Sequence, residues 1–158
     1  MAQGDFEVFS KCKENMGDGL FDLSDDTHRL ALTDGGTTDP PTENLGNPLW
    51  GSTGTPVPDF NLEEVTAGGN YTAEGESLSA VITDNWSLST NVGKFDGDDV
   101  TAWTQNAGNP TDAKYGILYD DTLTNNDCIG WLDIGGTFDM TTGDLTVTWA
   151  AAGIFTLT

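Results

Sequence analysis

The sequence is poor in basic residues, in histidine and in cysteine. Five Lys and Arg residues stand against 26 Asp and Glu residues, so the 158-residue chain has a formal net charge of −21. A field of this sign repels phosphate backbones and anionic lipid headgroups. No run of apolar residues approaches the length that a membrane-spanning helix needs. We therefore expect neither a nucleic acid nor a membrane among the partners.

The two cysteines, Cys12 and Cys128, lie far apart and lack the spacing of a metal site. We expect two buried free thiols, with a single disulfide bridge as the alternative. The first residues, Met1 to Asp5, lack the basic region and the apolar run of a secretory signal. The sequence therefore predicts synthesis and folding in a cytoplasm, without covalent cross-links.

Signatures of catalysis are scarce. His28 is the only histidine, and we expect it to be a solvated residue at the end of a strand. There is no Gly-x-Ser-x-Gly elbow, no Walker loop and no Gly-x-Gly-x-x-Gly fingerprint. Residues 96–99 begin like a calcium loop, but Thr101 and Ala107 stand where an EF-hand needs Gly and Glu. We predict no catalytic residue, no dedicated metal site and no cofactor, and weak cation binding by the acidic surface stays open.

The apolar content, with five Trp and seven Phe residues, suits one folded domain over residues 1–158. Residues 5–20 carry a helical period, with Asp5 as a plausible N-cap and with Gly17 and Gly19 ending the helix. Its apolar positions, three or four residues apart, are Phe6, Phe9, Cys12 and Met16.

From residue 27 onward, seven short segments alternate between apolar and polar residues or are continuously apolar, as strands are. The predicted strands are 28–33, 78–83, 99–104, 114–119, 128–134, 145–149 and 153–158. Clusters of Asp, Asn and Gly separate them as turns, Gly135-Gly136 among them. The prediction is a mainly β protein, an antiparallel β-sandwich or jelly-roll-like fold with one short N-terminal helix. Most of its sandwich strands lie in residues 60–158.

Residues 34–59 form a long segment with five of the six prolines and almost no periodicity. An extended loop of this length is uncommon in a compact domain and is usually functional or mobile. It carries Leu49 and Trp50, and an exposed Trp on a proline-stiffened arm is the kind of group that docks into a neighbour. The alternative is that the loop folds back and that Trp50 caps its own sandwich.

The segments after the helix follow an order typical of one family. They are Asp25-Asp26-Thr27-His28-Arg29-Leu30-Ala31-Leu32-Thr33, Gly69-Asn70-Tyr71-Thr72-Ala73-Glu74-Gly75, Val100-Thr101-Ala102-Trp103, Tyr115-Gly116-Ile117-Leu118-Tyr119-Asp120-Asp121, Ile129-Gly130-Trp131-Leu132-Asp133-Ile134 and Leu145-Thr146-Val147-Thr148-Trp149. Over nearly the whole chain, this order resembles small structural proteins of tailed bacteriophages, of the capsid decoration (cement) type. The resemblance implies a virion protein on the outer capsid surface, synthesised in the host cytoplasm, with the major capsid protein as partner.

We therefore expect a non-enzymatic protein that binds the shell, stabilises the head and assembles with itself, as a trimer over local threefold positions. The expected contacts to the shell or to sister subunits are Phe6, Phe9, Met16, Leu49 and Trp50. The alternative, which we favour for Phe6 and Phe9, is that the helix stripe packs on its own sandwich. Two other functions stay open: a neck, tail or fibre-associated virion subunit, and a carbohydrate-binding β-sandwich module with Trp50 or Trp86 as the residue that contacts the glycan.

Overall fold

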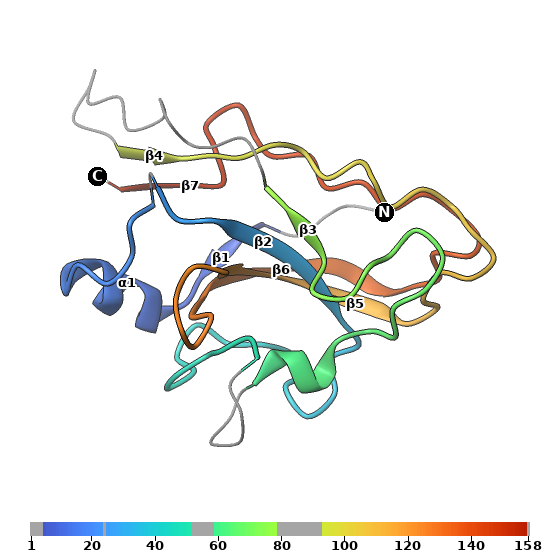
Figure 1. Ribbon diagram of the computed structural model, residues 1–158, viewed down its shortest axis with the longest axis horizontal. Coiled ribbons are helices and arrows are strands. Elements are labelled where there is room, and N and C mark those ends of the chain that lie inside the picture. Colours follow the sequence, from blue (N-terminus) through green and yellow to red (C-terminus); the bar gives the residue numbers. More distant parts are fainter. Residues whose placement is uncertain (1–4, 24, 52–58, 79–92, 158) are drawn as a thin grey trace.

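The computed structural model describes residues 5–23, 25–51, 59–78 and 93–157 (Figure 1). The elements are β1 (Glu7–Val8), α1 (Ser10–Gly17), β2 (His28–Thr33), the 3₁₀ helix η1 (Phe60–Glu63), β3 (Glu76–Ser77), β4 (Gly93–Phe95), β5 (Ala113–Asp120), β6 (Cys128–Phe138) and β7 (Phe155–Leu157). The mainly β class with antiparallel strands and one short N-terminal helix is confirmed.

Five strands form the central sheet in the order β1-β6-β5-β2-β3, and β4 pairs with β7 in a separate two-stranded ribbon. Every strand pair in both sheets is antiparallel. The three central strands, β2, β5 and β6, are the ones that the sequence predicts most directly. Seven of the eight residues of β5 are buried, so this strand is covered on both of its faces.

The register of the sheet divides its side chains between two faces, because directly paired residues point to the same side. Leu30 pairs with Leu118 on one face, which we call the ribbon face because β4 and β7 lie over it. The His28 ring, on that face, meets the Phe95 ring of β4 at 5.1 Å. The opposite face, here the loop face, carries Ile117 paired with Trp131, and residues 34–51 and η1 lie against it (Figure 1).

The described part of the long segment, residues 34–51, folds back on the loop face, so the alternative for Trp50 is the one the structure shows. The Trp50 ring stacks on Tyr119 with ring centres 5.0 Å apart and planes 6° apart. The Trp50 N–H donates to Asn126 O, and the Leu49 carbonyl accepts from the N–H of Phe60. These bonds fix the backbone on both sides, and Leu49 and Trp50 are 5% and 1% exposed. The prediction of an exposed docking arm at these two residues is wrong.

The N-terminal helix is shorter than the predicted 5–20. Residues Glu7 and Val8 pair with β6 as an edge strand, and α1 therefore begins only at Ser10. Phe9, not Asp5, is the N-cap, and its N–H donates to Ile129 O. The Phe9 ring lies 4.7 Å from Trp131 and is fully buried. The helix stripe thus packs on its own sheet at Phe9, and the expected partner contact there is wrong.

Several other predictions are settled. Segments 99–104 and 145–149 are not regular strands; they run side by side and meet in a single bridge between Val100 and Val147. Gly135-Gly136 lies inside β6 rather than in a turn. Most of the predicted strand 78–83 lies outside the described residues.

Both cysteines are buried free thiols, as predicted. Burial raises the pKa of Cys12 to about 12, so this thiol stays protonated and unreactive at neutral pH. Within the described ranges, no helix has the length and apolar character needed to cross a membrane.

Replacing Trp50 by alanine tests the contribution of the folded-back segment to stability. We expect W50A to lower the free energy of unfolding by about 3–5 kcal/mol, because it leaves a cavity against Tyr119. Urea denaturation measures this loss. The control is Leu62→Ala on η1, where the side chain is 83% exposed and the expected change is within about 0.5 kcal/mol. Equal effects of the two substitutions would contradict a docked segment.

Candidate interaction surface

The five residues predicted as contacts separate into two groups. Phe9, Leu49 and Trp50 are core residues, so a partner cannot reach them without unfolding the chain. Phe6 and Met16 are only partly buried and pack against the edge of the core. Of the predicted set, these two retain surface that a partner can contact, and Phe6 belongs to a larger aromatic cluster.

The aromatic cluster joins the N-terminal segment to the C-terminal one. Phe6 meets Trp149 edge-to-face at 5.9 Å and stacks with Phe155 at 6.5 Å. Phe155 stacks in turn on the buried Phe95 at 4.9 Å. Phe6, Trp149 and Phe155 are each partly exposed, so the cluster begins in the core at Phe95 and reaches the surface at Trp149. Edge-to-face and offset pairs of this kind stabilise the orientation of the rings.

Two hydrogen bonds fix Trp149 to the neighbouring acidic loop. Its backbone N–H donates to Asp99 Oδ1 at 2.9 Å, and its indole Nε1–H donates to the Asp98 carbonyl oxygen at 3.0 Å. Both polar hydrogens are therefore used within the chain, and the ring is held in one orientation. A partly exposed Trp that is already ordered loses little side-chain entropy on binding a partner.

Trp149 separates two hollows of the surface. One, of about 390 Å³, is lined by Asp5, Phe6 and Ile154 among others. The other, of about 580 Å³, is lined by the acidic loop at Asp98 and Asp99. The arrangement offers an aromatic wall with carboxylates close to it on either side. Such a surface can bind protein side chains or a sugar ring, but it holds no nucleophile with a base partner.

Sequence reasoning missed Trp149 as a surface residue. The alternation of Leu145, Val147 and Trp149 assigns all three to one buried face, and Leu145 and Val147 are indeed buried. Trp149 differs because the strand does not continue regularly and its neighbours, Ala150 and Ala151, are exposed. The signal that was available is the pair Asp98-Asp99, whose oxygen atoms accept both Trp149 hydrogen bonds.

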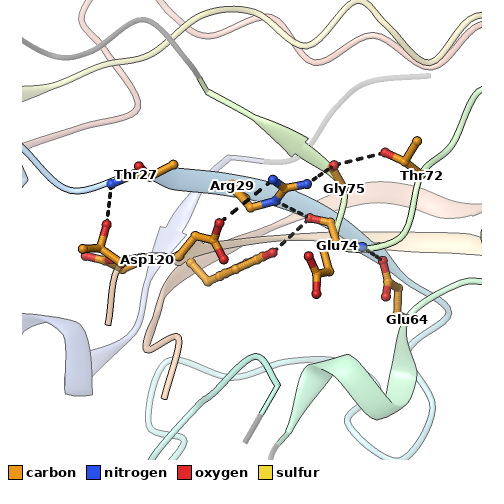
Figure 2. Close-up of polar contacts among 10 residues, drawn as sticks. Thr27, Arg29, Glu64, Thr72, Glu74, Gly75 and Asp120 are labelled. Atoms are coloured by element: carbon orange, nitrogen blue, oxygen red, sulfur yellow. Dashed lines mark hydrogen bonds and ion pairs between the residues drawn. The ribbon is translucent and has the colours of Figure 1, made fainter. Parts of the chain in front are cut away.

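Arg29, the only arginine, is the centre of a second polar cluster, on the loop face of the sheet (Figure 2). Its Nε donates to Glu74 O at 3.0 Å and its Nη2 donates to Gly75 O at 2.8 Å. The Tyr119 hydroxyl donates to the same Glu74 oxygen at 3.0 Å, and the Glu74 N–H donates to Glu64 Oε1. Because the guanidinium group of Arg29 donates to two main-chain carbonyl oxygens, this cluster stabilises the turn at Glu74 and Gly75, before β3. It does not form a free anion site.

Gly75 lies in the turn that Arg29 holds and has a φ of +69°. A Cβ at this position would overlap the Leu30 carbonyl oxygen of β2. We expect Gly75→Ala to lower the free energy of unfolding by at least about 2 kcal/mol, from backbone strain and steric overlap. Gly46→Ala is the matched control in thermal or urea denaturation, because a Cβ there meets nothing within 4 Å. Equal stability of the two variants would show that the turn is not tightly packed.

His28 is buried, which corrects the expectation of a solvated residue. It is 4% exposed, pairs with Asp120 across β2 and β5, and its Nε2 lies 3.8 Å from Asp120 Oδ2. Neither of these two atoms has a hydrogen-bond partner among the described residues. Burial lowers the pKa of His28 to about 4 and raises that of Asp120 to about 7. The backbone N–H of Thr122 donates to Asp120 Oδ1 and opposes part of the rise for Asp120.

The two pKa shifts act on stability in opposite directions. The contribution of His28 is lost as the pH falls from 6.5 towards 4, because the unfolded chain takes up the proton first. The contribution of Asp120 is lost as the pH rises from 3.8 towards 7, because the folded chain holds the proton longer. Over this window the two contributions partly cancel.

Single substitutions should separate the two contributions. Relative to the unaltered chain, we expect the unfolding free energy of Asp120→Asn to increase with pH between about 4 and 7. We expect that of His28→Gln to increase as the pH falls below 6.5. Urea denaturation at several pH values measures both curves. Curves that run parallel to that of the unaltered chain would contradict the shifted pKa values.

No group of three or more His, Cys, Asp or Glu side chains among the described residues could hold a metal ion. No family model, no curated protein and no solved structure matches the chain.

Proposed function

We propose that the chain is a non-enzymatic structural protein of a bacteriophage virion, a decoration protein that binds the outside of the head shell. Its partners are the major capsid protein and further copies of itself, assembled as a trimer. It acts by burying surface across the seams between shell subunits, which stabilises the assembled state over the separated one.

The observation that carries this proposal is the Trp149 surface. An ordered, partly exposed Trp beside hollows is typical of the residues that supply most of the energy in protein interfaces. The Trp149 ring contacts Phe6, Phe6 stacks on Phe155, and Phe155 stacks on the buried Phe95, so a chain of ring contacts connects Trp149 to the core. This arrangement suits adhesion, because binding needs no rearrangement of the backbone.

The charge of the chain supports an external position. A net charge of −21 is repelled by packaged nucleic acid and would be unfavourable inside a filled head. On the outer surface the same charge keeps particles apart in solution.

One alternative is a structural protein at another position of the virion, a neck, tail or fibre-associated subunit. The other is a carbohydrate-binding module, and Trp149 is the observation that favours it, since an aromatic face beside carboxylates also suits a sugar ring. Trp50 is buried and cannot serve a glycan, and Trp86 lies outside the described residues.

Binding of purified protein to undecorated shells tests the proposal. We expect Trp149→Ala to weaken binding about 30-fold, as the loss of an interface anchor worth about 2 kcal/mol does. Trp149→Phe should retain most of the affinity, and Leu62→Ala, on the exposed residue of η1, should change nothing. Sedimentation with shells gives the affinities.

Electron microscopy of intact particles distinguishes the alternatives. Decoration requires many copies spread over the shell, whereas a neck, tail or fibre part occurs in a few copies at one position. Binding of a glycan that quenches Trp149 fluorescence, without binding to shells, would replace the proposal by the carbohydrate-binding function. Light scattering of the free protein tests the trimer.

A further inference from the structure

Two segments that lie far apart in the sequence contain no charged residue. They are 65–73 and 102–111, in a chain that has 26 Asp and Glu residues. The two segments meet at the end of the molecule's long axis that lies opposite α1 (Figure 1). We call the surface that they form the uncharged end.

The two segments of the uncharged end pack backbone against backbone. A Cβ at Gly68 would lie 2.5 Å from the Gly108 carbonyl oxygen, so no side chain fits between them at this point. The Asn70 N–H donates to Asn109 Oδ1 at 2.6 Å, and the Asn70 Nδ2 donates to Thr104 Oγ1 at 2.7 Å. These contacts join the two segments into one continuous surface.

Side-chain amides also attach the uncharged end to the segment that follows β6. Asn109, which is 5% exposed, donates to the carbonyl oxygens of Thr104 and Met140 at 2.9 and 3.1 Å. The Gln105 Nε2 donates to Thr141 O at 2.9 Å. The backbone of this surface is therefore held by hydrogen bonds within the chain, and a partner that binds there has little conformational entropy to remove.

The exposed side chains of the uncharged end carry only methyl, hydroxyl and amide groups. They include Thr66, Ala67, Ala102, Gln105, Asn106 and Ala107. Asp112, Asp139 and Asp144 lie at its border. Asp144 Oδ1 accepts from the Gln105 N–H at 2.6 Å, and Asp139 Oδ1 accepts from the Thr141 N–H at 2.9 Å. Two of the three bordering carboxylates are thus engaged with the chain's own backbone.

The charge of the whole chain indicates which partner suits the uncharged end. Two copies that each carry a net charge of −21 repel one another. A contact between surfaces that bear carboxylates places like charges opposite each other, which opposes association. A contact through the uncharged end leaves the carboxylates outside the contact, where salt screens them. This surface therefore suits a second copy of the chain, whereas a cationic partner is attracted to the carboxylates elsewhere.

Two other uncharged segments suit a second copy less well. Residues 44–51 are uncharged, but Trp50 in their middle is buried against the sheet. Residues 145–157 are uncharged as well, but Asp5 and Asp98 line the hollows beside Trp149. A contact between copies at that surface would bring their carboxylates together.

We propose that the uncharged end is the surface through which copies of this chain associate with one another. Around a threefold axis at this end, residues 65–73 of one copy face residues 102–111 of the next, so both sides of every contact are uncharged. The inference rests on the proposed function for its trimer, and it deepens that proposal because it names the contact between the copies. The hollows beside Trp149 share no lining residue with the uncharged end, which leaves them for the shell.

Two carboxylates added to the uncharged end of the full-length chain test the proposal. The double variant Ala67→Glu, Ala107→Glu places one charge on each of the two segments, at exposed positions. We expect its self-association to be at least about tenfold weaker, because like charges then face each other across the contact. Sedimentation equilibrium over a range of protein concentrations measures the association constants.

Two further double variants are the controls. Ala150→Glu, Ala151→Glu adds the same two charges at exposed alanines beside Trp149 and should associate as the unaltered chain does. Ala67→Gln, Ala107→Gln adds side chains of the same length without charge and should retain most of the association. Circular dichroism establishes that each variant is folded. Equal weakening by the two glutamate pairs would reduce the effect to net charge and overturn the inference, and so would equal weakening by the glutamine and glutamate pairs at residues 67 and 107.

The contact can also be located without any substitution. We expect the amide resonances of residues 66–69 and 102–108 to shift between dilute and concentrated samples of the unaltered chain. Shifts confined to other residues would overturn the inference. A chain that stays monomeric at every concentration would overturn it too.

Shell binding separates this inference from the proposed function. If the unaltered chain binds shells but its copies associate through another surface or not at all, the inference fails while the decoration of the shell stands. If the copies associate through the uncharged end but the chain binds neither shells nor particles, the proposed function fails while the uncharged end remains the contact between copies.

Discussion

The central sheet must be covered on both of its faces, and the rest of the structure follows from this requirement. In the part of the chain that the structure describes, neither face is covered by a second full layer of strands. The ribbon face is covered by β4 and β7 together with the two irregular segments 99–104 and 145–149 (Figure 1). The loop face is covered by residues 34–51, η1 and α1. Irregular segments such as these form few backbone hydrogen bonds within themselves. Their buried N–H and C=O groups therefore need hydrogen-bond partners in distant parts of the chain. The bonds of Leu49 and Trp50 to residues 60 and 126 meet that need.

The sequence was sufficient where local pattern decides the structure. Alternation and apolar runs located β2 to the residue and placed β5 and β6 correctly, because these strands are buried over most of the predicted residues. Pattern was not sufficient where distant partners decide. Nothing near Trp50 in the sequence shows that Tyr119 will stack on it. His28 looked like a solvated residue because its partners, Asp120 and Phe95, are far along the chain.

The candidate surface shows the same limit. Phe6 was recovered because helical periodicity marks its apolar character, although it precedes the helix that the structure contains. Trp149 was not predicted as a surface residue, because the oxygen atoms that accept its hydrogen bonds belong to Asp98 and Asp99, about fifty residues earlier. Net charge, by contrast, could be read directly. What the sequence could not show is that every lysine and the one arginine lies within 4.0 Å of a carboxylate oxygen of the same chain.

The folded-back segment also bears on how the chain reaches this structure. Leu49 bridges to Asp127, the residue before β6, and to Asp59, so its position depends on a residue far along the chain. Contacts between residues so far apart in sequence close large loops, which slows folding relative to helical proteins of similar size. In a chain that is not yet folded, the apolar residues of the loop face, Tyr119 and Ile117 among them, are open to solvent. The excess of negative charge keeps such chains apart and so opposes their aggregation.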